Sequence, residues 1–374
     1  MARKLVNSAS VKNLALLASL TLVYFVAGSL VMRLAFVRPY VTPIWLPASI
    51  AFAAFILVGY RVWPAILLGS LLCHLTTIGF VLASFTIPAG ATLEGLAGAY
   101  LVKRFAHGAR AFDSAKGIFR FVLFACVCAP AISATLGVGR IYLAEHITWT
   151  DCGFKWFTWW LAHFIGILLG TPFLILLLRA SHHRLDRWEL TELAALLLGL
   201  VFVCLLVFSP LSLWLNKNHV VQAWLCLPFL VWAGFRFCPL EAAGTTLILF
   251  GSAIWGTLHG YGSFVAEDLT TSLFLLDTFI AVIGTMALVV AAMVVERRQI
   301  EGEILGTQSL LQKAIEEQER DLVVTVQALE MEAAGHLQTK RALRENQERI
   351  RRIAAHAKSD EKEQEDSTRG EWLE

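Results

Sequence analysis

Four ionisable side chains lie inside long apolar stretches of the sequence: His74, Glu94, His163 and Asp277. An ionisable group in the hydrocarbon of a membrane costs several kcal/mol, so it faces the protein interior and is a candidate for binding a ligand or an ion. We predict that all four lie at the midplane or in the outer half of a membrane, where they could form one ligand pocket. A purely structural role also stays open, because a hydrogen bond to a neighbouring helix would satisfy each group.

The composition places the chain among integral membrane proteins. Hydrophobic residues make up 57% of the 374 residues, charged residues make up only 16%, and the mean hydropathy is +0.64. Such values are outside the range of ordinary soluble domains. The charges are unevenly placed: residues 1–295 contain 18 Lys and Arg against 11 Asp and Glu, whereas residues 296–374 contain 13 against 18. We therefore expect an apolar, basic membrane domain followed by a polar, acidic segment.

The seven cysteines do not have the spacing of a disulfide framework or of a metal site. Six of them lie in apolar stretches or at their ends, and neither a Cys-x-x-Cys motif nor a His and Cys ligand pattern is present. Buried thiols of this kind behave as small hydrophobic groups. We predict no disulfide, no metal site and no cofactor.

Ten stretches meet or approach the roughly 20 apolar residues that a membrane helix needs. They are residues 13–36, 43–60, 62–80, 83–102, 118–140, 155–178, 190–215, 220–236, 239–258 and 272–295. If the short hairpins around Arg61 and Arg236 are re-entrant, nine or eight spans remain. With ten spans and a cytoplasmic start, thirteen Lys and Arg fall on the cytoplasmic side and five on the other, as the positive-inside rule favours. The predicted fold is an all-α polytopic membrane bundle with both termini in the cytoplasm.

One short motif occurs twice, at a constant offset of 175 residues. Residues 59–64 (Gly-Tyr-Arg-Val-Trp-Pro) match residues 234–239 (Gly-Phe-Arg-Phe-Cys-Pro), and a Gly with a small hydroxyl residue follows each copy. In each copy a helix is expected to end, the chain to reverse, and a new helix to begin near the Pro. We predict two matched cytoplasmic turns in a parallel repeat. Arg61 and Arg236 would either anchor these turns at the lipid headgroups or contact a signalling helix.

The polar segment has the period of a coiled coil. Six positions recur every seven residues: Ile315, Leu322, Leu329, His336, Leu343 and Ile350. The companion positions are mostly polar, so we predict a marginal, dimeric coiled coil. The expected organisation is a membrane domain over 1–298, a cytoplasmic helical stalk over 299–357 and a disordered polar tail over 358–374.

Several stretches of the membrane domain resemble, in order and spacing, the first membrane-associated sensor (MASE) domain family of bacteria. They are residues 45–51 (Trp-Leu-Pro-Ala-Ser-Ile-Ala), 59–65, 68–70, 91–94 (Ala-Thr-Leu-Glu), 98–101, 159–160 (Trp-Trp), 166–172 (Gly-Ile-Leu-Leu-Gly-Thr-Pro) and 232–236. The resemblance covers about residues 10–298. Two positions depart from the family pattern: Ala91 stands where the family usually has Asn, and Ala162-His163 stands where it often has Gly-Asp.

The resemblance implies a sensory module that passes a signal through a helical connector to a histidine kinase or a diguanylate cyclase. Neither a Gly-Gly-Asp-Glu-Phe motif nor an Asp-x-Gly-x-Gly motif is present, so we expect a stand-alone sensor or the front part of a longer protein. We predict an inner-membrane sensor without enzyme activity. Its expected partners are the lipid bilayer, an unknown small ligand, a second copy of the chain and the cytoplasmic output, with no nucleic acid.

Two other classes of protein are kept as alternatives. A small-solute transporter or channel would also have many spans, an internal repeat and buried carboxylates, although it has no need of a heptad stalk. An integral membrane enzyme could use His163 with Glu94 or Asp277 as acid and base, but no nucleophile motif accompanies them.

Overall fold

The structure is a computed structural model that describes residues 2–34, 42–145, 148–179, 186–215 and 222–370. The chain divides into two compact units, Met1–Gln299 and Ile300–Glu374. Each regular element of the described residues is a helix, so the predicted all-α class is confirmed.

We call the first unit, Met1–Gln299, the membrane unit. Its first seven α-helices form one group. Their bounds are α1 (Ala2–Leu34), α2 (Leu46–Leu57), α3 (Trp63–Ile78), α4 (Ala83–Phe105), α5 (Ala115–Phe121), α6 (Pro130–Glu145) and α7 (Trp149–Arg179). Helix α2 packs against α4 and α7, while α3 packs against α1 and α4. The short helix α2 thus lies among longer neighbours, and nine of its twelve residues are buried.

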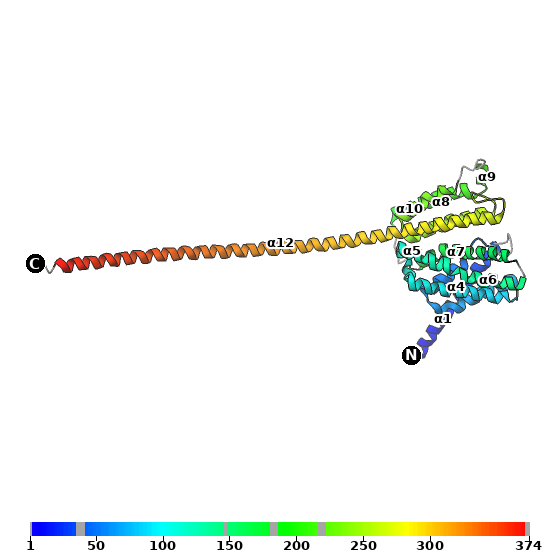
Figure 1. The fold of residues 1–374 in the computed structure, drawn as a ribbon, viewed down its shortest axis with the longest axis horizontal. Helices are drawn as coiled ribbons and strands as arrows, with labels where there is room; N and C mark the ends of the chain where they lie inside the picture. The colour runs from blue at the N-terminus through cyan, green and yellow to red at the C-terminus, as the bar shows by residue number, and fades with distance from the viewer. Residues whose placement is uncertain (1, 35–41, 146–147, 180–185, 216–221, 371–374) are drawn as a thin grey trace. The chain divides into compact units, whose positions relative to one another are not determined.

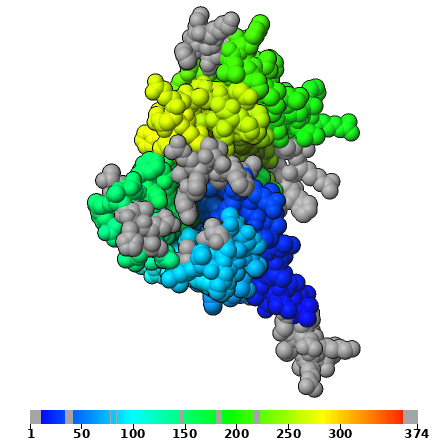
Figure 2. All heavy atoms as spheres, turned by 90° about the vertical axis from the view of Figure 1, so that its right-hand side faces the viewer, coloured from blue at the N-terminus to red at the C-terminus, as the bar shows by residue number. Residues whose placement is uncertain are grey.

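The second group of helices joins the first through α7 and α12. Its members are α8 (Arg187–Phe208), α9 (Leu211–Leu215), α10 (Leu227–Arg236), α11 (Pro239–Leu258) and α12 (Leu269–Gly370). Helix α11 packs against α7, α8 and α10. A Cβ atom at Gly284 of α12 would lie 3.4 Å from Leu168 of α7 and 3.4 Å from Phe250 of α11. The first part of α12 therefore packs against α7 of the first group and α11 of the second. In Figures 1 and 2 this part of the chain is yellow and borders green segments.

The predicted fifth span, residues 118–140, is interrupted in a way that its proline explains. Between α5 and α6 the chain forms a π-helix, Val122–Cys128, and α6 begins at Pro130. A proline has no N–H to donate, and its ring clashes with the carbonyl four residues earlier, so the preceding turn widens. The Trp160 indole of α7 donates a hydrogen bond of 2.8 Å to the Val127 carbonyl, which satisfies a group that the interruption exposes.

Helix length corrects part of the predicted span pattern. Five described helices are long and apolar enough to cross a membrane by length and composition: α1, the α5–α6 segment, α7, α8 and α12. The segments predicted as spans 43–60 and 220–236 instead contain the 12-residue α2 and the 10-residue α10. At 1.5 Å per residue, α2 is only about 18 Å long, whereas the hydrocarbon layer is about 30 Å thick. By length, neither short helix spans this layer by itself.

The two copies of the repeated motif differ in conformation. Gly59 has a φ of 102°, a left-handed value that glycine adopts easily, and a 3₁₀ turn over Tyr60–Val62 follows it. The matching Gly234 and Arg236 instead belong to α10, which ends at Arg236. In both copies a proline stands in the first turn of the next helix. As predicted, one helix ends and the next begins near the proline in both copies, but the backbone conformation of the two turns differs.

The second unit consists of the later part of α12. Side chains of residues 300–359 are all exposed in the single chain, including the six heptad positions. Helix α12 continues to Gly370, so most of the segment for which composition predicts a disordered tail is helical in the structure. Residues 371–374 of that tail lie outside the described residues.

Candidate functional site

Two of the four predicted ionisable residues form a buried pair. Nδ1 of His163 on α7 lies 2.8 Å from Oε2 of Glu94 on α4. Glu94 is 1% exposed and His163 is 5% exposed. Removing one partner of such a pair leaves an uncompensated polar group in a medium that cannot solvate it, which costs about 3–5 kcal/mol when that group is charged. The pair therefore ties α4 to α7 at this level of the bundle.

Two indole rings lie against the imidazole of this pair. The ring of His163 stacks on Trp45 with centroids 5.9 Å apart and on Trp159 with centroids 6.1 Å apart. Trp45 also lies 6.3 Å from His74 on α3, at a tilt of 53°. The structure thus brings three of the predicted residues, His74, Glu94 and His163, together around Trp45.

The position of Trp45 is fixed through the backbone. Its N–H donates a hydrogen bond of 2.9 Å to the carbonyl of Ala162, the residue before His163. This approach depends on Gly166, because a Cβ atom there would lie 2.7 Å from the Trp45 carbonyl carbon and would overlap its oxygen. One turn further along α7, a Cβ at Gly170 would lie 2.6 Å from the Cβ of Ser49. The two glycines let the start of α2 touch α7 directly.

A narrow cavity adjoins the pair, and it has no room for a water molecule. Its walls consist of three aromatic residues, four small residues and the pair itself: Tyr24, Trp45, Phe52, Ala48, Ala51, Ala91, Gly95, Glu94 and His163. Both positions at which the chain departs from the family pattern, 91 and 163, therefore line the same space.

Several buried oxygen atoms around the cavity have no hydrogen-bond partner among the described residues. They are Oε1 of Glu94, the hydroxyl of Tyr24 and Oγ of Ser70. The Tyr24 hydroxyl faces the side chains of Ser70 and Trp45, although not in hydrogen-bonding geometry. Buried polar groups are nearly always bonded, so these atoms would gain from a partner for which the packing leaves no room.

Asp277, the fourth predicted residue, does not line this cavity. It is on α12, is 5% exposed, and its Oδ1 has no hydrogen-bond partner among the described residues. Of the four predicted residues, Glu94 and His163 thus line the cavity, His74 lies next to Trp45 of its wall, and Asp277 lies elsewhere. Asp277 instead places a polar group on the helix that leaves the membrane unit.

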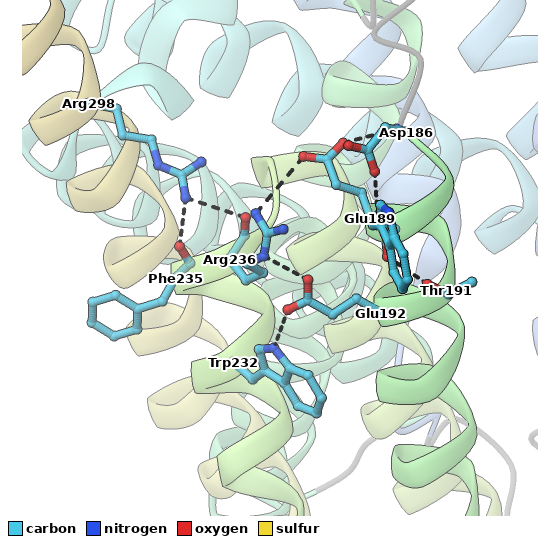
Figure 3. A network of polar contacts seen from close by, with 9 residues as sticks. Asp186, Glu189, Thr191, Glu192, Trp232, Phe235, Arg236 and Arg298 are labelled. Atoms are coloured by element: carbon cyan, nitrogen blue, oxygen red, sulfur yellow. Dashed lines mark hydrogen bonds and ion pairs between the residues drawn. The ribbon is translucent and has the colours of Figure 1, made fainter.

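The predicted turn residue Arg236 belongs to a polar network at the end of α10. Its Nε donates a hydrogen bond of 2.8 Å to Oε2 of Glu192 on α8, and the Trp232 indole donates one of 3.0 Å to the other oxygen. Glu189, one turn earlier, lies 4.0 Å from the Arg236 guanidinium and forms a capping box with Asp186. Figure 3 shows how this network ties the end of α10 to the start of α8.

Helix α12 joins the same network where it leaves the membrane unit. The guanidinium of Arg298 donates hydrogen bonds to the carbonyls of Phe235, at 2.8 Å, and Arg236, at 3.3 Å. These are among the last carbonyls of α10, which lack partners within the helix and carry partial negative charge. On α12 two residues earlier, Oε2 of Glu296 accepts a bond of 3.4 Å from the N–H of Ala115, at the start of α5. We call Glu296, Arg298, Arg236 and Glu192 the exit cluster.

Arg61, the counterpart of Arg236, has a different environment. It is exposed and makes no hydrogen bond or ion pair with any residue that the structure describes. The nearby Lys103 donates a bond of 2.6 Å to the Phe55 carbonyl and lies 4.5 Å from the Tyr60 ring centroid. Partial burial lowers the pKa of Lys103 below its ordinary value. Within the described residues, Arg236 forms a hydrogen bond with α12 through its carbonyl and Arg61 forms none.

Sequence reasoning named Arg236 but missed Tyr24, Trp45 and the other members of the exit cluster as functional candidates. Trp45 begins the first stretch of the family resemblance, which was a usable signal. The abrupt change from apolar to charged residues at Glu296 was also visible. Most of their partners are tens of positions away in the sequence, and no local pattern indicates such pairs.

The fold and this site define a polytopic α-helical membrane protein with a buried ionisable pair and a long polar helix. The MASE1 family model matches residues 16–298, and the chain belongs to this family of membrane sensory domains. The predicted resemblance is thereby confirmed. No curated protein and no solved structure matches the chain.

Proposed function

We propose that this chain is the signal-input module of a bacterial inner-membrane receptor, with both termini in the cytoplasm. A small ligand or a change in the membrane alters the packing around Glu94 and His163, and α12 passes the change to a histidine kinase or a diguanylate cyclase, in the same polypeptide or in a partner. The observation that carries this proposal is the continuity of α12. One helix contains the buried Leu276 and Ile280 of the membrane unit and extends to Gly370.

Helix α7 supplies a route from the buried pair to α12. His163 is on α7, and Leu168 and Leu169 of the same helix pack against Gly284 of α12. The Phe157 ring of α7 also lies 6.1 Å from the ring of Phe274 on α12. A ligand that changes how α4 and α7 pack therefore acts on a helix that contacts α12 at two levels.

The exit cluster supplies the contacts that a signal has to rearrange. Arg298 and Glu296 bind to the ends of two different helices, so they favour one rotational setting of α12 where it leaves the membrane unit. Because both contacts are partly exposed, each contributes modestly, on the order of 1 kcal/mol. Contacts of this strength can break and re-form if the bundle has two alternative packings and a ligand binds one of them with higher affinity.

A second copy of the chain is the proposed partner of the stalk. The apolar heptad residues from Ile315 to Ile350 are exposed in the single chain. Pairing two stalks would bury them, and the polar companion positions would keep this pairing weak. A weak coiled coil can change register or rotation, whereas a strong one would resist the change.

The experiment is a reporter fusion in which the stalk is joined, after Ala357, to a diguanylate cyclase domain. We expect Glu94→Gln and His163→Gln to lock the cyclase output in one state and to remove its response to growth conditions. Glu241→Gln is the matched control, because Glu241 is also a membrane-unit carboxylate with an oxygen that has no partner among the described residues.

Insertion and helix content of each variant are measured separately, so that misfolding is not read as loss of signalling. Equal output from wild type and both pair variants would overturn the assignment of the input site. Uptake of a radiolabelled solute into proteoliposomes, abolished by Glu94→Gln, would favour the transporter alternative.

A further inference from the structure

We propose that Cys204 and Cys226 form a redox-active dithiol, which a disulfide oxidant converts into a disulfide between α8 and the start of α10. Both cysteines are free thiols in the structure. They lie on other elements than the Glu94–His163 pair, so this modification site goes beyond the signal input described above. The geometry that carries the proposal is the antiparallel packing of α8 and α10.

Two contacts fix the register of α8 against α10. Glu192 of α8 accepts a hydrogen bond of 3.0 Å from the Trp232 indole of α10. Later in α8, a Cβ atom at Gly199 would lie 2.7 Å from the ring of Phe229, which comes earlier in α10. Because one sequence number rises while the other falls, the two helices are antiparallel. The next level of contact therefore joins the end of α8 to the residues just before Leu227, where α10 begins.

Cys204 and Cys226 occupy this next level, and their thiols face each other. Cys226 is the last residue of the 3₁₀ turn Ala223–Cys226, and this turn packs against α8. Cys204 is 3% exposed and Cys226 is fully buried. A disulfide needs two Cβ atoms about 3.5–4.5 Å apart whose bonds to sulfur point toward each other. Facing thiols on two packed elements can meet this requirement with small side-chain movements.

Neighbouring residues of one loop hold both elements at this level. The N–H of Ala223, in the 3₁₀ turn, donates a hydrogen bond of 3.1 Å to Oγ of Ser263. The next residue of the loop, Phe264, stacks on Phe208 at the end of α8, with centroids 6.1 Å apart. The end of α8 and the turn before α10 are thus fixed to adjacent positions of the same loop, so the two thiols are held close together.

The location gives the dithiol access to an oxidising compartment. Cys204 is twelve positions after Glu192 of the exit cluster, which is about 18 Å along α8 at 1.5 Å per residue. Because α12 leaves the membrane unit at the exit cluster, the dithiol lies toward the opposite face. In the proposed topology this face is periplasmic. Disulfides form and persist in the periplasm, whereas thiols in the cytoplasm stay reduced.

The reaction is thiol–disulfide exchange, with a protein or small-molecule disulfide as the oxidant. One thiol of the chain attacks the oxidant, forms a mixed disulfide with one half of it and releases the other half as a thiol. The second thiol of the chain then displaces the remaining half. The chain loses two S–H bonds and gains one S–S bond, and the oxidant takes up both protons and leaves as two thiols. The new bond closes a loop of 22 positions and fastens α10 to α8.

The experiment treats the full chain in lipid nanodiscs with the aromatic disulfide dithiodipyridine. The remaining thiols are blocked with N-ethylmaleimide, and mass spectrometry of the digested chain identifies the cysteines that are joined. We expect a disulfide between Cys204 and Cys226 in wild type and its loss in Cys204→Ala. Cys152→Ala is the matched control, because Cys152 is a buried cysteine on another helix, and it should keep the disulfide. The oxidised wild type should unfold at a higher concentration of dodecyl sulfate than the reduced protein, and dithiothreitol should reverse this shift.

Two results in wild type would overturn the proposal. One is a free thiol or a separate thiopyridyl adduct at both positions, and the other is a disulfide from Cys204 or Cys226 to a different cysteine. These results do not depend on any variant, and circular dichroism shows whether Cys204→Ala is folded. Glu94→Gln should still form the disulfide, because the two sites share no residue. Failure of the dithiol therefore leaves the proposed signal input standing, and failure of the reporter fusion leaves the dithiol standing.

Discussion

Gly166 holds the start of α2 against α7, and replacing it with Ala gives the sharpest stability prediction. The new Cβ would lie 2.7 Å from the Trp45 carbonyl carbon, and ordinary contact begins at 3.4 Å. Because the obstacle is backbone, no side-chain rotation relieves the overlap. Overpacking of this kind costs about 1–3 kcal/mol, and loss of the Trp45 N–H bond to Ala162 adds about 1 kcal/mol. We expect Gly166→Ala to lower the free energy of unfolding by about 2–4 kcal/mol.

Gly153 in the same helix is the matched control. No atom lies within 4 Å of a Cβ placed there, so Gly153→Ala tests helix propensity alone and should stabilise by up to about 1 kcal/mol. The assay is unfolding in mixed micelles by added dodecyl sulfate, followed by circular dichroism and tryptophan fluorescence. If Gly166→Ala were as stable as Gly153→Ala, the close approach of Trp45 to α7 would be refuted, and with it the position of the indole against His163.

Two further predictions concern the exit cluster and a buried hydroxyl. Arg298→Gln removes the bonds to the last carbonyls of α10, which are worth about 0.5–1 kcal/mol on a partly exposed side chain. The rate of amide hydrogen exchange around residues 290–300 should therefore rise about two- to fivefold. Arg61→Gln should leave this rate unchanged, and an equal rise in both variants would contradict the role of the exit cluster. Thr171 is fully buried, and its hydroxyl has no hydrogen-bond partner among the described residues, so Thr171→Val should stabilise the fold by up to about 1–2 kcal/mol. Thr245→Val loses a bond of 2.8 Å to the Glu241 carbonyl and should not stabilise it. Denaturation of both threonine variants checks this, and a destabilised Thr171→Val would show that the hydroxyl has a partner in solution.

The sequence predicted the fold class because apolar stretches in a membrane have few alternatives to helix. It was less successful where a helix is short. Residues 43–60 are apolar throughout, but α2 ends at Leu57 because Gly59 reverses the chain. In a similar way, Pro130 divides a continuous apolar stretch into a π-helix and α6. Hydropathy reports burial, and it does not report where the backbone changes direction.

The candidate site was predictable in its residues and less so in its geometry. Glu94 and His163 were identified because charge in an apolar stretch is costly, and the structure pairs them at 2.8 Å. Asp277 is also an ionisable residue in an apolar stretch, but it does not line the same cavity. Such a position predicts that a side chain is buried and does not predict which helix it packs against. Trp45 was missed as part of the site, since its contact with α7 depends on Gly166, 121 positions away.

The central claim is that the Glu94–His163 pair sets the state of the stalk. Single cysteines along residues 310–350, introduced into a background without the native cysteines, are crosslinked in native membranes between copies of the chain. The account predicts that the positions that crosslink change between wild type and Glu94→Gln or His163→Gln, and stay as in wild type for Glu241→Gln. One fixed crosslinking pattern in all four proteins would contradict it.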